Sequence, residues 1–169
     1  FTKKNQWVLD PFVGVGGTLL GCSLSNRRGV GVDLENNYLK IYQNVCKELA
    51  FGEQITTKAD SRKIEDAIKK LRTQNKKIPK QFDLILTDPP YGNMMRKKRT
   101  ADIQTSSKGK TNTPFSESKH DIGNLELEEF LNELKMIVQN SINLLKNKKY
   151  LVVFIKDMQP KEDHDNMLH

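Results

Sequence analysis

The sequence VLDPFVGVGGT occupies residues 8–18 and decides the fold class. Its apolar start predicts a buried strand, its glycines a turn, and the residues that follow the start of a helix. Such a turn lets the backbone approach a ligand closely, with the helix N-terminus directed at it. The spacing is not the Gly-x-Gly-x-x-Gly of dinucleotide enzymes, so ordinary strand-to-helix packing is an alternative to a nucleotide site.

Apolar segments alternate with segments of helical periodicity along the chain. We expect strands at 6–12, 29–34, 54–59, 82–87 and 149–155, and helices at 17–26, 36–50, 62–73 and 125–146. This alternation is typical of βαβ units around a mainly parallel sheet with helices on both faces. The length of 169 residues suits one domain with a buried core. We therefore expect a single α/β domain over residues 1–169.

The composition favours a polyanionic partner. The formal net charge is +7 and the pI is about 9.3, and lysine and arginine neutralise phosphates with release of counterions. A lysine-rich surface without such a partner is the alternative. Cys22, Cys46 and the three histidines lack metal-ligand spacing, so we expect no metal. No membrane span or signal peptide is visible, which predicts a cytoplasmic protein without membrane contact.

A second informative word, TDPPYG, fills residues 87–92 at the end of an expected strand. Its prolines lack N–H groups and fix φ, which makes the rim of the sheet rigid here. This rim can therefore hold a carboxylate acceptor, Asp88, and an aromatic face, Tyr91, in fixed positions. A turn that only terminates the strand is the alternative. The expected catalytic residues are Asp88, Pro89, Pro90 and Tyr91.

Acidic residues follow the second and third expected strands. Asp33 lies roughly twenty residues beyond the glycines, where a carboxylate can accept both hydroxyls of a ribose. Asp60 follows the strand at 54–59 and is expected either to accept a hydrogen bond from an adenine amine or to cap the next helix. Both positions suit a nucleoside cofactor.

The words DPFVGVGG, residues 10–17, and TDPPYG resemble those of DNA amino-methyltransferases, which use S-adenosylmethionine to methylate adenine N6 or cytosine N4. The resemblance implies a Rossmann-like methyltransferase fold with sheet order 3-2-1-4-5, S-adenosylmethionine as cofactor and double-stranded DNA as partner. The expected cofactor-binding residues are Asp10, Phe12, Gly14, Gly16, Asp33, Asp60 and Ser61. In this family the aromatic residue at the Phe12 position lies against the cofactor. The resemblance also implies a role for residues 88–91, because the amine of a nucleobase is a poor nucleophile and acceptors must hold its N–H groups. The Asp88 carboxylate and the Pro89 carbonyl can do this, while Tyr91 stacks on a base turned out of its helix.

The same resemblance bears on the target base. Asp at the first position of DPPY is commoner in adenine-N6 enzymes and Ser in cytosine-N4 enzymes, so adenine is favoured and cytosine stays open. A tRNA guanine-N2 methyltransferase, whose motif also reads Asp-Pro-Pro-Tyr-Gly, is the principal alternative, with RNA as the partner. The second alternative is a non-catalytic module of a larger assembly that binds cofactor or nucleic acid. Carbon-5 methylation is disfavoured because neither cysteine lies near this word.

Residues 92–123 form a polar, basic insertion. We expect a mobile flap that contacts nucleic-acid backbone through Arg96, Lys97, Lys98 and Arg99. A surface loop without such a role is the alternative. Against the family pattern the chain looks like a fragment at both ends, truncated before the final β-hairpin. A recognition domain or a restriction endonuclease is therefore an expected partner.

Overall fold

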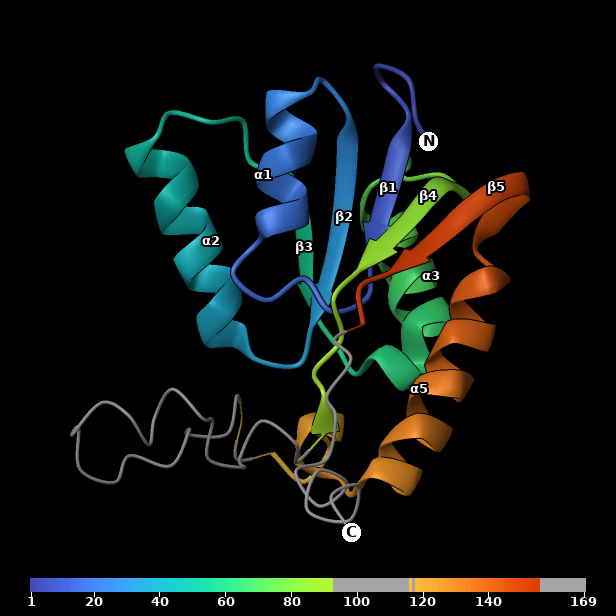
Figure 1. Ribbon diagram of the computed structural model, residues 1–169. Helices are drawn as coiled ribbons and strands as arrows, with labels where there is room; N and C mark the ends of the chain where they lie inside the picture. The colour runs from blue at the N-terminus through green and yellow to red at the C-terminus, as the bar shows by residue number, and fades with distance from the viewer. Residues whose placement is uncertain (93–115, 117, 156–169) are drawn as a thin grey trace, which may run out of the picture.

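The computed structural model describes residues 1–92, 116 and 118–155 (Figure 1). Its sheet has five strands in the order β3-β2-β1-β4-β5, and all four neighbouring pairs are parallel. The strands are β1 (Trp7–Asp10), β2 (Arg28–Asp33), β3 (Ile55–Lys58), β4 (Phe82–Thr87) and β5 (Leu145–Val153). The expected order 3-2-1-4-5 is confirmed.

Helices cover both faces of this sheet (Figure 1). They are α1 (Gly17–Leu24), α2 (Asn36–Glu48), α3 (Ile64–Gln74) and α5 (Leu127–Ile142), with two short 3-10 turns, η1 (Ser61–Lys63) and η3 (Ile122–Asn124). The α1 and α2 side is built around the fully buried ring of Tyr42. On the other face, Ile64 and Ile68 of α3 pack on the central strands. Burial of these apolar stripes is the main stabilising contribution to the fold.

A glycine in the middle of β2 sets how closely the glycine-rich turn approaches the sheet. A Cβ on Gly31 would lie 2.6 Å from a methyl group of Val13, so only glycine allows the turn to pack against β2. The Val13 N–H also donates to the Val32 carbonyl at 3.0 Å. These contacts hold the turn at the carboxyl end of the strands.

The boundary between the last helix and the last strand differs from the sequence prediction. The helix ends at Ile142 and the strand begins at Leu145, whereas we expected helix to 146 and strand from 149. Lys146 pairs with the buried carboxylate of Asp83 at 2.8 Å, which holds this segment beside β4. An irregularity follows, with Lys148 at φ 59°. A lysine-rich strand start resembles a helix C-terminus in sequence, and this explains the error.

The structure adds to the expectations on cysteines, metals and membranes only for the residues it describes. Cys22 and Cys46 are buried free thiols. No group of His, Cys, Asp or Glu with the geometry of a metal site occurs among the described residues. No helix within 1–92 or 118–155 combines the length and the apolar character that crossing a membrane requires.

Candidate active site

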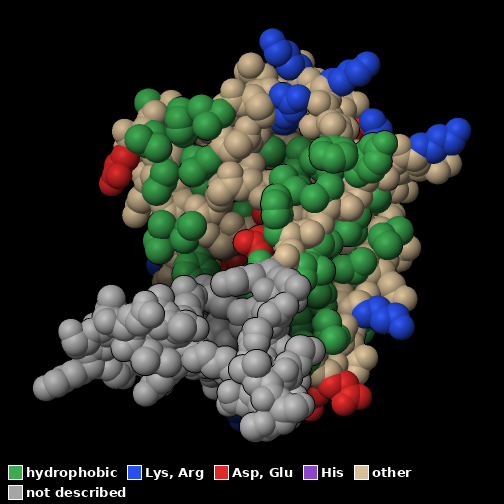
Figure 2. Space-filling view, viewed as in Figure 1, with side chains coloured by type: hydrophobic (Ala, Val, Ile, Leu, Met, Phe, Trp, Pro, Cys, Tyr) green, Lys and Arg blue, Asp and Glu red, His purple; other side chains and the backbone are tan. Residues whose placement is uncertain are grey.

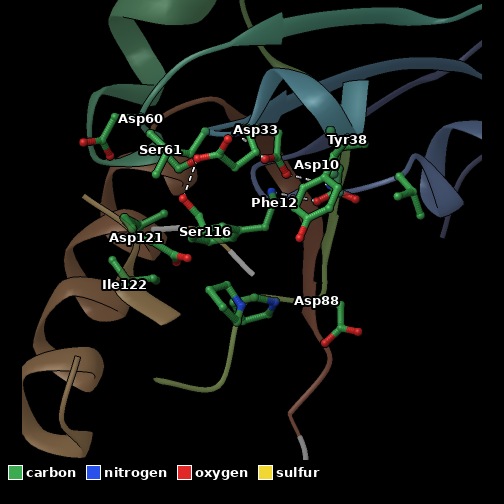
Figure 3. A pocket seen from close by; sticks show the side chains of 18 of the residues that line it. Asp10, Phe12, Asp33, Tyr38, Asp60, Ser61, Asp88, Ser116, Asp121 and Ile122 are labelled. Atoms are coloured by element: carbon green, nitrogen blue, oxygen red, sulfur yellow. Dashed lines mark hydrogen bonds between the residues drawn. The ribbon is translucent and has the colours of Figure 1, made fainter. Parts of the chain in front are cut away.

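A pocket of about 460 Å³ opens at the carboxyl edge of the sheet (Figure 3). Gly14 and Gly17 of the glycine-rich turn line one side of it, and residues 88–91 line another. The two motifs follow β1 and β4, which are neighbours at the centre of the sheet. This is the point where the strand order reverses, and open α/β sheets bind their ligands there.

The glycine-rich turn presents its backbone to this pocket. Gly14 has φ 51°, and a Cβ placed there or on Gly17 would meet no atom within 4 Å. Gly16 differs: it does not line the pocket, and its Cβ would clash with the ring of Tyr42. Core packing therefore explains why this position is glycine, and the assignment of Gly16 to the cofactor site stays a prediction.

Asp33 lies at the pocket edge and binds the turn directly. Its Oδ2 accepts the Gly14 N–H and its Oδ1 accepts the Glu35 N–H, both at 2.8 Å. Burial raises the pKa of the Asp33 carboxyl, and these two hydrogen bonds oppose the shift. Each oxygen retains a lone pair, so the carboxylate can still accept a hydroxyl group. Glu35 and Tyr38 also line the pocket, and the sequence analysis did not select either of them.

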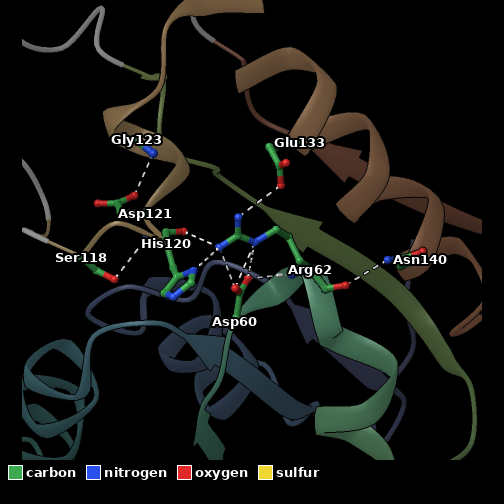
Figure 4. Close-up of polar contacts among 8 residues, drawn as sticks. All are labelled: Asp60, Arg62, Ser118, His120, Asp121, Gly123, Glu133 and Asn140. Atoms are coloured by element: carbon green, nitrogen blue, oxygen red, sulfur yellow. Dashed lines mark hydrogen bonds and ion pairs between the residues drawn. The ribbon is translucent and has the colours of Figure 1, made fainter. Parts of the chain in front are cut away.

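Asp60 caps η1, which is the alternative that the sequence left open. Its Oδ1 accepts the Arg62 N–H at 3.0 Å, and the Arg62 guanidinium contacts Oδ2 at 2.7 Å (Figure 4). Burial disfavours the Asp60 charge, but the hydrogen bonds from Arg62 outweigh it and lower the Asp60 pKa. Arg62 also donates to the His120 carbonyl at 3.0 Å and pairs with Glu133 of α5 at 3.4 Å. Asp60 nevertheless lines the pocket.

Asp10 forms the floor of the pocket and is 3% exposed. Its Oδ1 accepts the Phe12 N–H at 3.0 Å and the Thr87 hydroxyl at 2.7 Å. Burial outweighs these hydrogen bonds and raises the Asp10 pKa to about 6. The nearby Ser61 hydroxyl donates to the Pro11 carbonyl. Phe12 lies half-buried at the pocket wall.

The DPPY word forms the opposite wall. Asp88 is exposed and Pro89 fully buried, and the Tyr91 hydroxyl donates to Asp88 Oδ1 at 2.6 Å. Burial and the neighbouring Asp88 carboxylate raise the Tyr91 pKa to about 12. Asp88 Oδ2 has no hydrogen-bond partner among the described residues. The hydrogen bond from Tyr91 therefore holds the carboxylate and the ring as one unit.

The segment that returns from the insertion completes the pocket. His120, Asp121 and Ile122 line it, as does Ser116, whose hydroxyl donates to the Glu35 carboxylate. We expected the insertion to run through residue 123, yet Asp121 and Ile122 at its end are buried. No local signal in the sequence placed them at the site. The predicted nucleic-acid contacts Arg96, Lys97, Lys98 and Arg99 lie outside the described residues.

The pocket suits a ligand with hydrogen-bond donors and positive charge. Among the described residues, its lining contains no lysine or arginine. It contains six carboxyl side chains, which are Asp10, Asp33, Glu35, Asp60, Asp88 and Asp121. S-adenosylmethionine carries a sulfonium, an ammonium, an adenine amine and two ribose hydroxyls. The carboxyl oxygens and the open backbone at Gly14 and Gly17 fit these groups, and the volume lies within the usual range for a ligand of this size.

Comparisons with known proteins agree with this chemistry. A family model described as DNA methylase matches residues 1–44. The chain is 28% identical over 91 residues to a tRNA (guanine(10)-N2)-dimethyltransferase of Pyrococcus abyssi, covering 54% of this chain and 25% of the relative. It is 30% identical over 77 residues to the type II methyltransferase M.MthZI of Methanothermobacter thermautotrophicus, covering 46% and 21%. The chain thus spans a quarter or less of the length of these relatives.

Solved structures show the same fold. TrmN from Thermus thermophilus superposes with a TM-score of 0.57 at 17% identity, covering 90% of this chain and 33% of that one. A SAM-dependent methyltransferase from Agrobacterium tumefaciens gives 0.55 at 14% identity, covering 98% and 44%. The family match and the fold together support the expected cofactor, S-adenosylmethionine. The resemblance of residues 1–44 to the DNA methylase family is therefore confirmed, and so is the expected Rossmann-like fold.

Proposed function

We propose that this chain transfers a methyl group from S-adenosylmethionine to an exocyclic amine of a nucleobase in DNA, with adenine N6 as the favoured target. The observation that carries the proposal is the pocket shared by the glycine-rich turn and residues 88–91. The family model described as DNA methylase covers the first of these motifs, which favours DNA.

On the cofactor side, we assign binding to residues that line the pocket beside β1, β2 and β3. Asp33 accepts the ribose hydroxyls, the carboxyl group of Asp60 lies where it can accept the adenine amine, and Phe12 packs on the cofactor. Asp10 and Ser61 hold the turn from below through their contacts with Phe12 and Pro11. When bound, the cofactor supplies an electrophilic methyl group on its sulfonium.

On the target side, we assign the chemistry to the DPPY word. Asp88 Oδ2 and the Pro89 carbonyl accept the two N–H groups of the target amine, which leaves its lone pair directed at the methyl group. Tyr91 stacks on the extruded base, and its hydroxyl fixes the Asp88 carboxylate through Oδ1. The prolines keep this wall rigid because each fixes its own φ.

A second candidate is methyl transfer to guanine N2 of tRNA. The match to the tRNA (guanine(10)-N2)-dimethyltransferase supports it, since that match covers 54% of this chain. Guanine N2 is also an exocyclic amine, so the same acceptors serve both reactions. For either substrate, we propose the basic residues 96–99 as backbone contacts, and a recognition domain or an endonuclease as a partner.

Labelled methyl transfer tests the proposal. Purified protein is incubated with labelled S-adenosylmethionine and either unmethylated duplex DNA or unmodified tRNA, and the product nucleoside is identified by mass spectrometry. We expect N6-methyladenine in DNA. N2-methylguanine in tRNA would instead support the second candidate, and no transfer to either would contradict both.

The Asp88→Ala variant tests the assigned chemistry. It should abolish transfer and leave the calorimetric affinity for S-adenosylmethionine unchanged, because Asp88 lies on the target side of the pocket. The matched control is Asp66→Asn, which removes an exposed carboxylate from α3, outside the pocket. Transfer that survives in Asp88→Ala would refute the role given to this carboxylate.

A further inference from the structure

Acidic and basic side chains of the described residues gather at opposite ends of the parallel strands. Where strands end, carboxyl groups line the pocket. Where strands begin, lysine and arginine gather, and Figure 2 shows these side chains at the end of the molecule where β1 and β5 start in Figure 1. We call this second group the basic rim; it comprises Lys3, Lys4, Arg27, Arg28, Lys76, Lys77, Lys80, Lys146, Lys148 and Lys149.

The basic rim lacks neighbouring acids in sequence. The segments that contain it lie at the starts of β1, β2, β4 and β5, and none contains Asp or Glu; they are residues 1–6, 25–28, 75–81 and 143–149. The segment before β3 differs, because it carries Glu53 and no lysine or arginine. Asp83 of β4 offsets part of the charge, because its buried carboxylate contacts Lys146 at 2.8 Å and Lys149 at 4.0 Å. Lys76, Lys77 and Lys80 are exposed. Most of the rim charge therefore faces solvent.

A small hollow lies beside the loop that precedes β4. It has a volume of about 140 Å³ and is lined by Lys69, Arg72, Thr73 and Lys76. The Arg72 side chain donates to the Ile78 carbonyl at 3.4 Å, which ties it to this loop. Three cationic side chains around a hollow with a hydroxyl group form a surface suited to phosphate oxygens.

The pocket differs from this surface in charge. Its described lining carries carboxyl groups and no lysine or arginine, so by itself it repels the phosphate backbone that accompanies a target base. Attraction for a polyanion has to come from cations outside the pocket. Within the described residues, the basic rim is where cations are most concentrated without intervening acids.

We propose that the basic rim binds the phosphate backbone of nucleic acid, at a segment separate from the one whose base enters the pocket. The inference rests on the proposed function. The six residues of β4 span ~20 Å, so the rim and the pocket lie about one strand length apart, at opposite ends of the strands. A nucleic acid that passes along the domain reaches both.

Charge-neutralised variants test this surface. Lys76→Gln, Lys77→Gln and Lys80→Gln are combined in a rim variant, and Lys40→Gln, Lys47→Gln and Lys135→Gln in a control with the same charge change on α2 and α5. Fluorescence anisotropy measures binding to a duplex of about 40 base pairs over a range of salt concentrations. Co-sedimentation measures binding to phosphatidylserine vesicles. Calorimetry with S-adenosylmethionine reports the pocket, and thermal unfolding reports the fold.

We expect the rim variant to bind the duplex about tenfold more weakly, with a salt slope reduced by about 2 to 3. Its affinity for S-adenosylmethionine should match wild type, as should all values for the control. Equal losses in both variants, or none in the rim variant, would overturn the proposal. So would a loss confined to anionic phosphatidylserine vesicles. Absence of methyl transfer by wild type would refute the proposed function separately, because the binding comparison does not depend on turnover.

Discussion

The buried Asp10 carboxyl makes stability depend on pH in a predictable direction. Its pKa rises from the ordinary 3.8 to about 6 in the folded state, so the native protein binds this proton more tightly than the unfolded chain. The contribution of Asp10 to stability is therefore complete below about pH 3.8 and is lost as the pH rises through about 6. A shift of about two pKa units corresponds to about 3 kcal/mol.

Asp10→Asn removes this titration and keeps an oxygen acceptor for Phe12 and Thr87. Other groups titrate in both proteins, so the informative quantity is the difference in the free energy of unfolding between variant and wild type. We expect this difference to move in favour of the variant by about 2.4 kcal/mol between pH 4 and pH 7. Urea unfolding followed by the fluorescence of the single tryptophan, Trp7, measures it.

The matched variant Thr87→Val removes the hydroxyl that stabilises the Asp10 charge. It should raise the Asp10 pKa further and enlarge the loss of stability above pH 6. A difference between Asp10→Asn and wild type that stays constant from pH 4 to pH 7 would refute the reasoning, because the buried carboxyl would then titrate as it does in the unfolded chain.

Three further variants test the packing and the contacts of the site. Gly16→Ala should cost about 2–5 kcal/mol of unfolding free energy, because φ is 90° and the new Cβ would meet the Tyr42 ring. The control Gly17→Ala has open space at its Cβ and should not lower the unfolding free energy in this way. Equal losses of the two variants in urea unfolding would contradict this prediction. Arg62→Met should lower the free energy of unfolding by about 1–3 kcal/mol, and it should weaken cofactor binding in calorimetry because Asp60 is no longer held in place. The control Glu133→Gln removes only the 3.4 Å contact and should lower the free energy of unfolding by less than about 1 kcal/mol. Tyr91→Phe keeps the ring but loses the bond to Asp88, so the methyl-transfer rate should fall about tenfold with cofactor affinity unchanged; a wild-type rate would show that this bond does not position Asp88.

Local pattern was sufficient to predict the sheet and most of the elements. Alternation of apolar and amphipathic segments predicts the βαβ order, and β4 has the predicted bounds. Residues 88–91 and the glycine-rich turn adjoin strand ends, so topology alone brings them to one edge. Their neighbours in the pocket, such as His120 and Ile122, come from a segment without periodicity, and only the tertiary structure places them there.

Two features of the site have physical causes that sequence does not reveal. A glycine with positive φ can make room for a ligand or for the core, and at Gly16 the ring of Tyr42 from α2 fills the space where a Cβ would lie. The capping role of Asp60 was foreseen, but the contacts of Arg62 with His120 and Glu133 were not. Pairs separated by tens of residues leave no local signature, so the links between η1, α5 and the returning segment required coordinates.

The hydrogen bond between the Thr87 hydroxyl and the Asp10 carboxyl joins the ends of β1 and β4 beneath the pocket. Neighbouring strands are about 4.8 Å apart, so the separation of the two motifs is built into the sheet. Under the proposed function, donor and acceptor are aligned by backbone pairing and need no domain movement to meet. Evolution could then exchange the parts that choose a target sequence without disturbing the alignment on which the chemistry depends.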